Sequence, residues 1–324
     1  MRIALAATGR LGMSLMAGLE PSSHQIVLCV QDGRKTRGIA RWLRRLSARL
    51  PGGSSVVLGR ALRMGVPVLW LDTMSEAEIA PLRELEVDVL LVGGFGIILK
   101  EPLLSTPRVG CVNTHSSLLP RHRGPNPFAA AVLAGDTETG VTFHGIDAGI
   151  DTGPILDQTA FAVGPRDTAA AVYRKACDAA RDRVAEVMDR VARDGIAGRP
   201  QPEGEGGYDK RVRLEDAEID WSQPAEAIDR RIRGLSGTQP AWFRYRGRRI
   251  EIVRAHFDDG PAKAPPGMVV RRRPNLVVAT GSGRLHIRVA YSTGPLRWIW
   301  PMPWNRPRIG QRLTETGSKL TNAG

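Results

Sequence analysis

The sequence predicts an α/β fold with a mostly parallel sheet, followed by a small open β-barrel. Over residues 1–196, short apolar runs rich in β-branched residues alternate with helical patterns, which is typical of a doubly wound sheet. A segment rich in Gly, Pro and Glu follows, and beyond it the pattern changes to short strands separated by turns, as in small barrels. The chain has 324 residues, 42% of them hydrophobic, which is enough for two domains with their own cores.

The elements of the first domain follow from the periodicity of its apolar residues. Five strands are predicted in the parallel sheet, at Ile3–Ala7, Gln25–Val30, Val66–Leu71, Val87–Val92 and Val109–Asn113. Helices are predicted between them at Leu11–Leu19, Gly38–Leu50 and Glu76–Leu85. Two further strands, Gly140–Ile146 and Ile155–Ala162, are expected to join the sheet in antiparallel orientation. A long helix is predicted over Asp167–Asp194, because it begins at Asp167 or Thr168 and ends at Gly195.

The second domain is predicted to be mostly β. A helix is expected at Pro224–Leu235, and strands are expected at Arg248–His256, Gly267–Arg272, Leu276–Thr280 and Leu285–Val289. The RWIWPMPW stretch, residues 297–304, is interpreted as tryptophans that pack against this barrel. We therefore expect a first domain over residues 1–196, a linker over 197–207, a barrel over 208–315 and a disordered tail over 316–324.

The positive charge is concentrated in the second predicted domain. The net charge is +13, and residues 207–324 hold 22 Lys and Arg against 11 Asp and Glu, whereas residues 1–206 hold 24 against 22. Such a basic domain is the electrostatic footprint expected for a polyanion such as nucleic acid. The alternative is a solvated face of arginines without a partner.

Other classes of protein are disfavoured by the sequence. No apolar run is long enough to span a bilayer, and the start, MRIALAATGRLG, lacks the features of a signal peptide, so we expect a cytoplasmic protein without membrane contact. Cys29, Cys111 and Cys177 are far apart and odd in number, which indicates core residues instead of a disulfide framework or a metal cluster.

A polar motif lies at the end of the fifth predicted strand. The run CVNTHSSLLPRHRGP places Asn113 and His115 on alternate positions, and a later loop, DAGIDTG, carries Asp151. These groups suit acyl transfer to an amine. Asn113 offers donors for an oxyanion, and His115 titrates near neutrality. Asp151 is able to orient His115 or to accept the proton of the amine.

Each of the three residues also has a purely structural interpretation. A single histidine near a strand end is more often structural, and Asn and Asp beside turns commonly satisfy backbone groups. His122 and His144 compete with His115 for the role of a reactive imidazole. No GxSxG, P-loop or GxGxxG pattern and no zinc-like spacing occurs, so no metal is expected.

Taken together, the motifs resemble a known family. NTHSSLLPRHRG and ETGVTFHGIDAGIDTGPIL are similar to the N-x-H-x-S-L-L-P-x-x-x-G and D-x-G-x-D-T-G patterns of formyltransferases that use 10-formyltetrahydrofolate. Further on, YDKRVRLEDAEIDWSQPAEAIDRRIRGL resembles the start of the smaller domain of that family. The resemblance covers about residues 1–315. It implies a Rossmann-like formyltransferase domain followed by an open, OB-like β-barrel.

The same resemblance implies which residues form the site. In that family the catalytic trio falls on the positions of Asn113, His115 and Asp151. The segment matching VDVLLVGGFGIILKEPLL lines the folate pocket in relatives, as does the loop matching SLLP. The implied contacts of the formyl donor, 10-formyltetrahydrofolate, are Phe95, Gly96, Ile97, Ile98, Leu99, Ser117, Leu118, Leu119, Pro120 and Asp147.

The acceptor is less closely specified. The chain resembles the methionyl-tRNA members of the family, and we favour initiator Met-tRNA as the amine mainly because the basic C-terminal domain suits its phosphates. Four segments depart from those members: AATGRLGMS, the basic DGRKTRGIARWLRRLSARLPGG, RGPNP and SGTQPAWF. They match positions near acceptor recognition in the family. An amino-sugar nucleotide or another small biosynthetic amine therefore stays open as acceptor, and hydrolysis of the donor is a further alternative.

Overall fold

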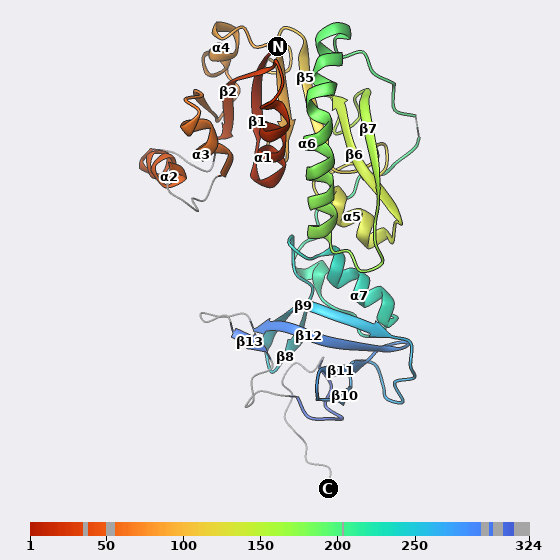
Figure 1. Ribbon diagram of the computed structural model, residues 1–324. Helices are drawn as coiled ribbons and strands as arrows, with labels where there is room; N and C mark the ends of the chain where they lie inside the picture. The colour runs from red at the N-terminus through yellow and green to blue at the C-terminus, as the bar shows by residue number, and fades with distance from the viewer. Residues whose placement is uncertain (35–37, 50–55, 203, 293–297, 301–306, 314–324) are drawn as a thin grey trace. The chain divides into compact units, whose positions relative to one another are not determined.

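The computed structural model describes residues 1–34, 38–49, 56–202, 204–292, 298–300 and 307–313 (Figure 1). The chain divides into two compact units. Unit 1 comprises Met1–Pro127, Glu138–Ala162 and Tyr173–Lys210, and unit 2 comprises Phe128–Thr137, Val163–Val172 and the chain from Arg211 onward. Residues 197–207, which the composition marks as a linker, lie within unit 1. The predicted tail, residues 316–324, lies outside the described residues.

Unit 1 is built on a seven-stranded sheet with the strand order β3-β2-β1-β4-β5-β6-β7. The first five strands in this order are parallel, whereas β6 is antiparallel to both of its neighbours. This confirms the predicted α/β fold and both antiparallel additions. The strands are β1 (Arg2–Ala7), β2 (Gln25–Asp32), β3 (Val68–Leu71), β4 (Val89–Gly93), β5 (Gly110–His115), β6 (Glu138–Gly145) and β7 (Ile155–Ala162).

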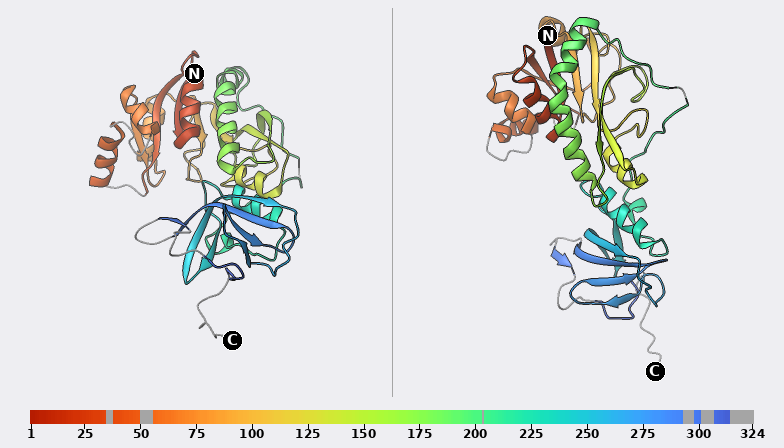
Figure 2. Two further views of the ribbon diagram at one scale, coloured as in Figure 1. Left: turned by 60° about the horizontal axis from the view of Figure 1, so that its bottom comes forward. Right: turned by 45° about the vertical axis from the view of Figure 1, so that its right-hand side comes forward.

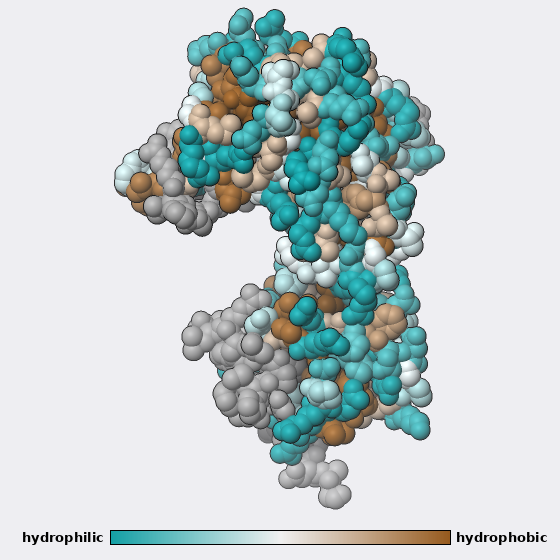
Figure 3. Space-filling model, in the orientation of Figure 1, coloured by the Kyte–Doolittle hydropathy of each residue, from teal (hydrophilic) through white to brown (hydrophobic). Residues whose placement is uncertain are grey.

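Helices cover both faces of this sheet, as expected of a doubly wound fold (Figure 2). Apolar residues of α1, α3 and α6 share one core with the sheet, and α4 contributes to a second core on the other face. Hydrophilic residues cover the outer side of α6 (Figure 3). The helices before the second domain are α1 (Gly9–Leu19), α2 (Ile39–Arg49), α3 (Val56–Arg63), α4 (Glu76–Glu84), α5 (Pro127–Ala134) and α6 (Ala169–Asp194).

Two helices show what the sequence pattern did and did not specify. The Oγ1 of Thr168 accepts a hydrogen bond from the N–H of Ala171 at 3.2 Å, so Thr168 caps α6 as predicted. Helix α3 was not predicted, because Val56, Val57 and Gly59 have low helix propensity. Gly59 is needed for packing: the carbonyl oxygen of Ala48 in α2 lies 2.2 Å from where a Cβ would stand.

Phe143 anchors β6 in the core that contains α6, and its side chain is fully buried. Replacing Phe143 with alanine is expected to lower the free energy of unfolding by about 3–5 kcal/mol, because the change removes buried apolar surface and leaves a cavity. Urea denaturation followed by circular dichroism measures this. Phe161→Ala on the partly exposed β7 is the control and is expected to cost much less; equal costs would contradict the packing described.

Unit 2 contains a six-stranded antiparallel sheet with the order β10-β11-β12-β9-β8, with β13 paired to β12. Helix α7 (Ala225–Gly234) packs against β9. This curled antiparallel sheet confirms the predicted small open barrel, although β8 and β13 were not expected. The strands are β8 (Trp242–Tyr245), β9 (Arg248–Asp258), β10 (Val269–Arg271), β11 (Leu276–Ala279), β12 (Arg284–Ser292) and β13 (Trp298–Trp300). Of the RWIWPMPW stretch only β13 is described; residues 297 and 301–304 lie outside the described part.

The cysteines are buried, as the sequence predicted. Burial raises the pKa of the Cys29 and Cys177 thiols to about 11 and that of Cys111 to about 12. Thiols with such pKa values stay protonated at neutral pH and act as apolar core groups. None of the helices in the described residues has the length and apolar character needed to cross a membrane.

Candidate active site

Asn113 and His115 project from the same face of β5. Side chains alternate along a strand, so these two share one face while Thr114 belongs to the other. Thr114 pairs across the sheet with Phe143, which belongs to the core shared with α6. The face with Asn113 and His115 is therefore turned away from α6. The strand extends to His115, two residues beyond its predicted end, because His115 still pairs with Thr142 of β6.

Asp151 reaches both residues from the loop between β6 and β7. Its Oδ1 lies 3.3 Å from the Nδ2 of Asn113 and 3.6 Å from the Nδ1 of His115. Its Oδ2 accepts a hydrogen bond from the backbone N–H of Gly124 at 2.9 Å. Asp151 has a φ of 56°, in the left-handed region where aspartate is one of the few enriched non-glycine residues. The three residues that the sequence singled out thus meet around one carboxylate.

His144 is a fourth member of this cluster. The sequence left it as a competitor of His115, but β6 pairs with β5 so that His144 stands opposite Asn113. Its Nε2 lies 3.0 Å from the Nδ2 of Asn113 and 3.7 Å from the Oδ1 of Asp151. Its Nδ1 faces the carbonyl oxygen of Gly145 at 2.8 Å and carries the proton there, because a carbonyl only accepts. In the neutral ring, Nε2 therefore accepts a hydrogen bond from the amide of Asn113 and fixes its orientation.

The proton of His115 is placed by the same reasoning. The Nε2 of His115 lies 2.9 Å from the carbonyl oxygen of His122, so Nε2 donates. This leaves Nδ1 facing Asp151 as the basic nitrogen of the neutral ring. His122, the other competing histidine, turns its Nδ1 to the Oδ2 of Asp209 at 2.7 Å. His122 therefore contributes its backbone carbonyl to the cluster, and its ring forms a separate hydrogen bond with Asp209.

The surroundings lower the pKa of both titrating groups of the trio. Burial is the main cause for His115, whose pKa lies below its usual range although the charge of Asp151 opposes the shift. Burial raises the pKa of Asp151, but the imidazoles of His144 and His115 and the N–H of Gly124 together outweigh it, so this pKa also lies below its usual range. At neutral pH the site therefore holds an ionised carboxylate beside a neutral imidazole.

The loop Ser117–Pro120, implied as part of a folate pocket, is held by two polar side chains of the same sheet face. The Oγ1 of Thr142 donates to the carbonyl of Ser117 at 2.6 Å and accepts from the N–H of Leu119 at 3.1 Å. The Nε2 of Gln158 donates to the carbonyl of Leu119 at 2.8 Å. Leu118 lies against Gly140, where its Cδ2 is 2.5 Å from the position of a Cβ. The loop is thus fixed beside the cluster by residues that the sequence did not single out.

The other implied folate contacts lie at the ends of neighbouring strands. Residues Phe95–Leu99 follow β4, which pairs with β5, at the carboxyl edge of the sheet where doubly wound folds bind ligands. Ile97 and Leu99 are buried in the core, whereas Gly96 and Ile98 are exposed. The Oδ1 of Asp147 accepts hydrogen bonds from the N–H of Gly149 and the hydroxyl of Thr152, which shapes the loop that carries Asp151.

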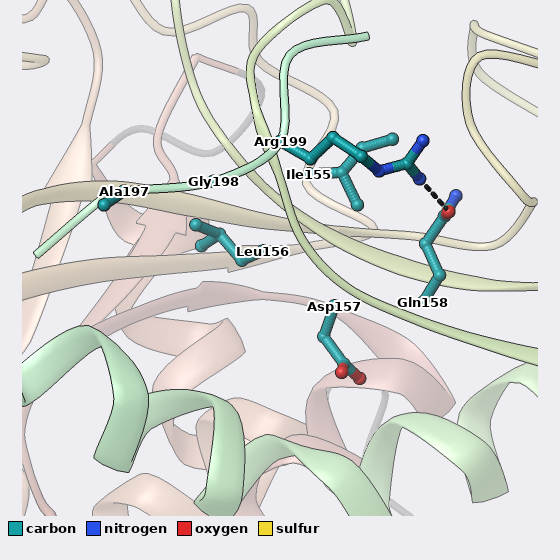
Figure 4. A pocket seen from close by; sticks show the side chains of 7 residues that line it. All are labelled: Ile155, Leu156, Asp157, Gln158, Ala197, Gly198 and Arg199. Atoms are coloured by element: carbon teal, nitrogen blue, oxygen red, sulfur yellow. Dashed lines mark hydrogen bonds between the residues drawn. The ribbon is translucent and has the colours of Figure 1, made fainter. Parts of the chain in front are cut away.

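A separate cavity of about 610 Å³ lies between β7 and the segment after α6 (Figure 4). It is lined by Ile155, Leu156, Asp157, Gln158, Ala197, Gly198 and Arg199. The trio does not line it, so it is a different feature from the candidate active site. Among the described residues no group of three or more His, Cys, Asp or Glu side chains is placed to hold a metal ion.

Comparison with known proteins identifies the family. The sequence model described as "Formyl transferase" matches residues 71–188, and that described as "Formyl transferase, C-terminal domain" matches residues 211–294. The methionyl-tRNA formyltransferase of Thiobacillus denitrificans is 35% identical over 300 residues, which cover 92% of this chain and 94% of the relative. That of Methylococcus capsulatus is 32% identical over 298 residues, which cover 92% and 94%.

Solved structures show the same fold. An N-formyltransferase from Helicobacter canadensis, solved with folinic acid and dTDP-3-aminofucose, has a TM-score of 0.63 at 17% identity and covers 88% of this chain and 98% of its own. HypX from Aquifex aeolicus has a TM-score of 0.64 at 15% identity and covers 93% of this chain and 47% of its own. From its sequence relatives, two family matches and fold, this chain belongs to the formyltransferase family.

Proposed function

We propose that this chain transfers the formyl group of 10-formyltetrahydrofolate to a primary amine at the site of Asn113, His115 and Asp151. The observation that carries the proposal is that three side chains converge on one atom, the Oδ1 of Asp151. The amide of Asn113 and the imidazoles of His115 and His144 lie 3.3, 3.6 and 3.7 Å from the Oδ1 of Asp151. An amide donor, a basic ring nitrogen and an ionised carboxylate at one point are the groups that formyl transfer to an amine needs.

Each group has a distinct part in the proposed reaction. The amine nitrogen bonds to the formyl carbon, the carbonyl oxygen becomes an oxyanion, and the bond to N10 of the folate then breaks. Asn113 donates to the oxyanion, in place of its longer contact with Asp151. The proton that the amine loses is taken up between the Oδ1 of Asp151 and the Nδ1 of His115. It then passes to N10 as that nitrogen leaves. His144 keeps the amide of Asn113 aimed at the reacting oxygen.

The pH dependence of this reaction follows from the pKa shifts. Asp151 and His115 act in their deprotonated forms, and both pKa values are lowered. The active state therefore persists as the pH falls from 8 and is lost only when His115 takes up a proton, below its ordinary pKa of 6.5. A profile of kcat/KM against pH, with a saturating donor and normalised to the fraction of acceptor present as neutral amine, is expected to be flat near neutrality and to fall below pH 6.5. An acid limb above that value would contradict the assignment.

Support for the folate donor comes from the residues beside the trio. Ser117, Leu118, Leu119 and Pro120 form one loop of the proposed pocket, and Phe95–Leu99 form another with Gly96 and Ile98 exposed for contact. Asp147 lies at the start of the loop that carries Asp151. The folinic acid bound to the Helicobacter canadensis relative is a formylated folate, which fits this donor.

For the acceptor we favour the amino group of Met-tRNA, bound by the basic domain over residues 208–315. The relatives in Thiobacillus denitrificans and Methylococcus capsulatus carry the name methionyl-tRNA formyltransferase. Exposed arginines line the strands and turns of unit 2, as a phosphate backbone requires. They include Arg244, Arg246, Arg248, Arg254, Arg271, Arg272, Arg273, Arg288, Arg308 and Arg312. Unit 1 adds a segment between Asp32 and Asp72 with nine basic residues and no acidic one, namely Arg34, Lys35, Arg37, Arg41, Arg44, Arg45, Arg49, Arg60 and Arg63.

A small amino-sugar nucleotide is the second candidate acceptor. The Helicobacter canadensis relative was solved with dTDP-3-aminofucose and covers 88% of this chain. The departures at RGPNP and in the basic segment after β2 also favour it, because they stand where the methionyl-tRNA members carry other residues.

One experiment separates the candidates. The purified full chain is incubated with 10-formyltetrahydrofolate and, in parallel, with Met-tRNA, a panel of amino-sugar nucleotides, or no acceptor. Formyl-Met-tRNA is the expected product. A formylated sugar would replace the favoured acceptor with the second candidate, and formate release without any acceptor would identify a hydrolase. No turnover in any reaction would overturn the proposed function.

A further inference from the structure

The segment after α6 is a structural part of the active site. Residues 197–207 were interpreted as a linker from their composition, yet backbone bonds pin this stretch to unit 1 on both sides of Gln201. Ahead of Gln201, Arg199 forms an antiparallel bridge with Ile155, with N–H to O distances of 2.8 and 2.9 Å. Beyond it, Tyr208 bridges Arg123, and the N–H of Asp209 donates to the carbonyl of Arg123 at 2.8 Å.

Gln201 uses every polar atom of its side chain at this site. Its Nε2 donates to the backbone carbonyls of Asp151 at 2.8 Å and of Gly153 at 2.9 Å. Its Oε1 accepts from the Nε and Nη2 of Arg123 at 3.2 and 2.7 Å. Two donors and one acceptor oxygen are thus all satisfied, and the half-buried side chain has a single orientation.

The backbone that Gln201 holds needs an external tether. Asp151 is a non-glycine residue with a φ of 56°, a conformation that surrounding contacts must impose. Two residues further on, Gly153 lies so close to the carbonyl of Gly145 that a Cβ would stand 1.9 Å from that oxygen. The amide of Gln201 spans this turn and fixes the carbonyl of Asp151, which in turn fixes where the carboxylate points.

Arg123 connects Gln201 to the carboxylate of Asp151 and to the ring of His115. The loop that carries Arg123 donates the N–H of Gly124 to the Oδ2 of Asp151 and offers the carbonyl of His122 to the Nε2 of His115. Its position is set by the bonds of Arg123 to residues 201, 207 and 209. A second chain of bonds begins at Arg199, whose Nη2 donates to the Oε1 of Gln158 (Figure 4). The Nε2 of Gln158 donates in turn to the carbonyl of Leu119.

We infer that Gln201 is a positioning residue for catalysis: its amide, braced by Arg123, holds the strained turn at Asp151 so that the carboxylate meets His115 and Asn113. This inference rests on the proposed formyl transfer. Gln201 does not touch the reacting atoms. Its effect is to keep Asp151 within the small displacement that a catalytic group tolerates.

Two substitutions test this inference. Gln201→Glu keeps an acceptor for Arg123, and so the brace, but loses both donors to the turn. Gln201→Met has a similar size and loses the donors and the acceptor. Both variants are expected to lower kcat for formyl transfer by about 10- to 100-fold, with smaller changes in KM for either substrate. Gln201→Met is also expected to move the acid limb of kcat/KM to lower pH. His115 sets that limb, and its pKa falls further when the carboxylate of Asp151 moves away from the ring.

Gln25→Glu is the matched control. Gln25 is exposed at the start of β2, the opposite end of the strand from the ligand-binding edge, and this change is expected to leave kcat and the pH profile unaltered. Melting curves report whether each variant folds. If Gln201→Met does not fold, the kcat of Gln201→Glu decides the test. Wild-type kcat in folded Gln201→Glu, or an unshifted profile in folded Gln201→Met, would overturn the inference while leaving the proposed function intact. An inactive wild-type protein would instead overturn the proposed function.

Discussion

Replacing Asp151 with asparagine is expected to lower kcat for formyl transfer by about 10³-fold, within the range that proton-transfer groups contribute. The amide has the shape of the carboxylate, so the variant keeps the contact with the N–H of Gly124 through its oxygen. It loses the negative charge, accepts no proton from the attacking amine, and no longer offers the amide of Asn113 a charged acceptor. Single-turnover kinetics with bound donor measures the chemical step directly.

Two comparisons make this result specific. Asp182→Asn on the outer side of α6, where the side chain is 62% exposed, is expected to leave kcat unchanged. The double variant Asp151→Asn with His115→Ala is expected to cost little more than Asp151→Asn alone, because groups that act as a unit are strongly non-additive. Turnover of Asp151→Asn within about 10-fold of the wild type would remove the carboxylate from the proposed mechanism.

Binding of Met-tRNA is expected to weaken by about 10³- to 10⁵-fold between 50 and 200 mM salt, the loss typical of six to ten phosphate contacts. The physical cause is the release of cations that are condensed on the phosphates. The arginines of unit 2 take the place of these cations when the tRNA binds. The expected log–log slope is about −0.7 to −0.9 for each phosphate that an arginine neutralises. Filter binding or fluorescence anisotropy over a salt series gives this slope.

Variants of unit 2 locate the arginines that bind phosphate. Changing Arg271, Arg272 and Arg273 together to alanine is expected to make the slope shallower by about 0.7–0.9 for each phosphate that is no longer neutralised. Arg193→Ala is the control, because this side chain is 67% exposed on the last turn of α6 and already lies near Asp194. A slope near zero for the wild-type protein would exclude a polyanionic acceptor and favour a small amine.

Much of the fold could be predicted from local patterns. Strands β1, β2 and β4 are apolar runs bounded by turns, and the order of strands and helices specifies a doubly wound sheet. The exceptions have identifiable causes. Helix α3 contains two β-branched residues and a glycine that its contact with α2 requires, so its sequence lacks a helical signal. β8 and β13 have only four and three residues, which is too short for a clear alternation.

The candidate trio can be found from the amino-acid sequence, because Asn113 and His115 alternate on one strand and their motif, with that of Asp151, resembles a known family. The residues around the trio are apparent only in the folded chain. His144 joins the site through the register between β5 and β6, and Gln201 reaches Asp151 across 50 residues of sequence. Local periodicity reports which side of a strand a residue occupies. Hydrogen bonds between distant segments depend on where the folded backbone places each donor and acceptor, and no local pattern encodes that.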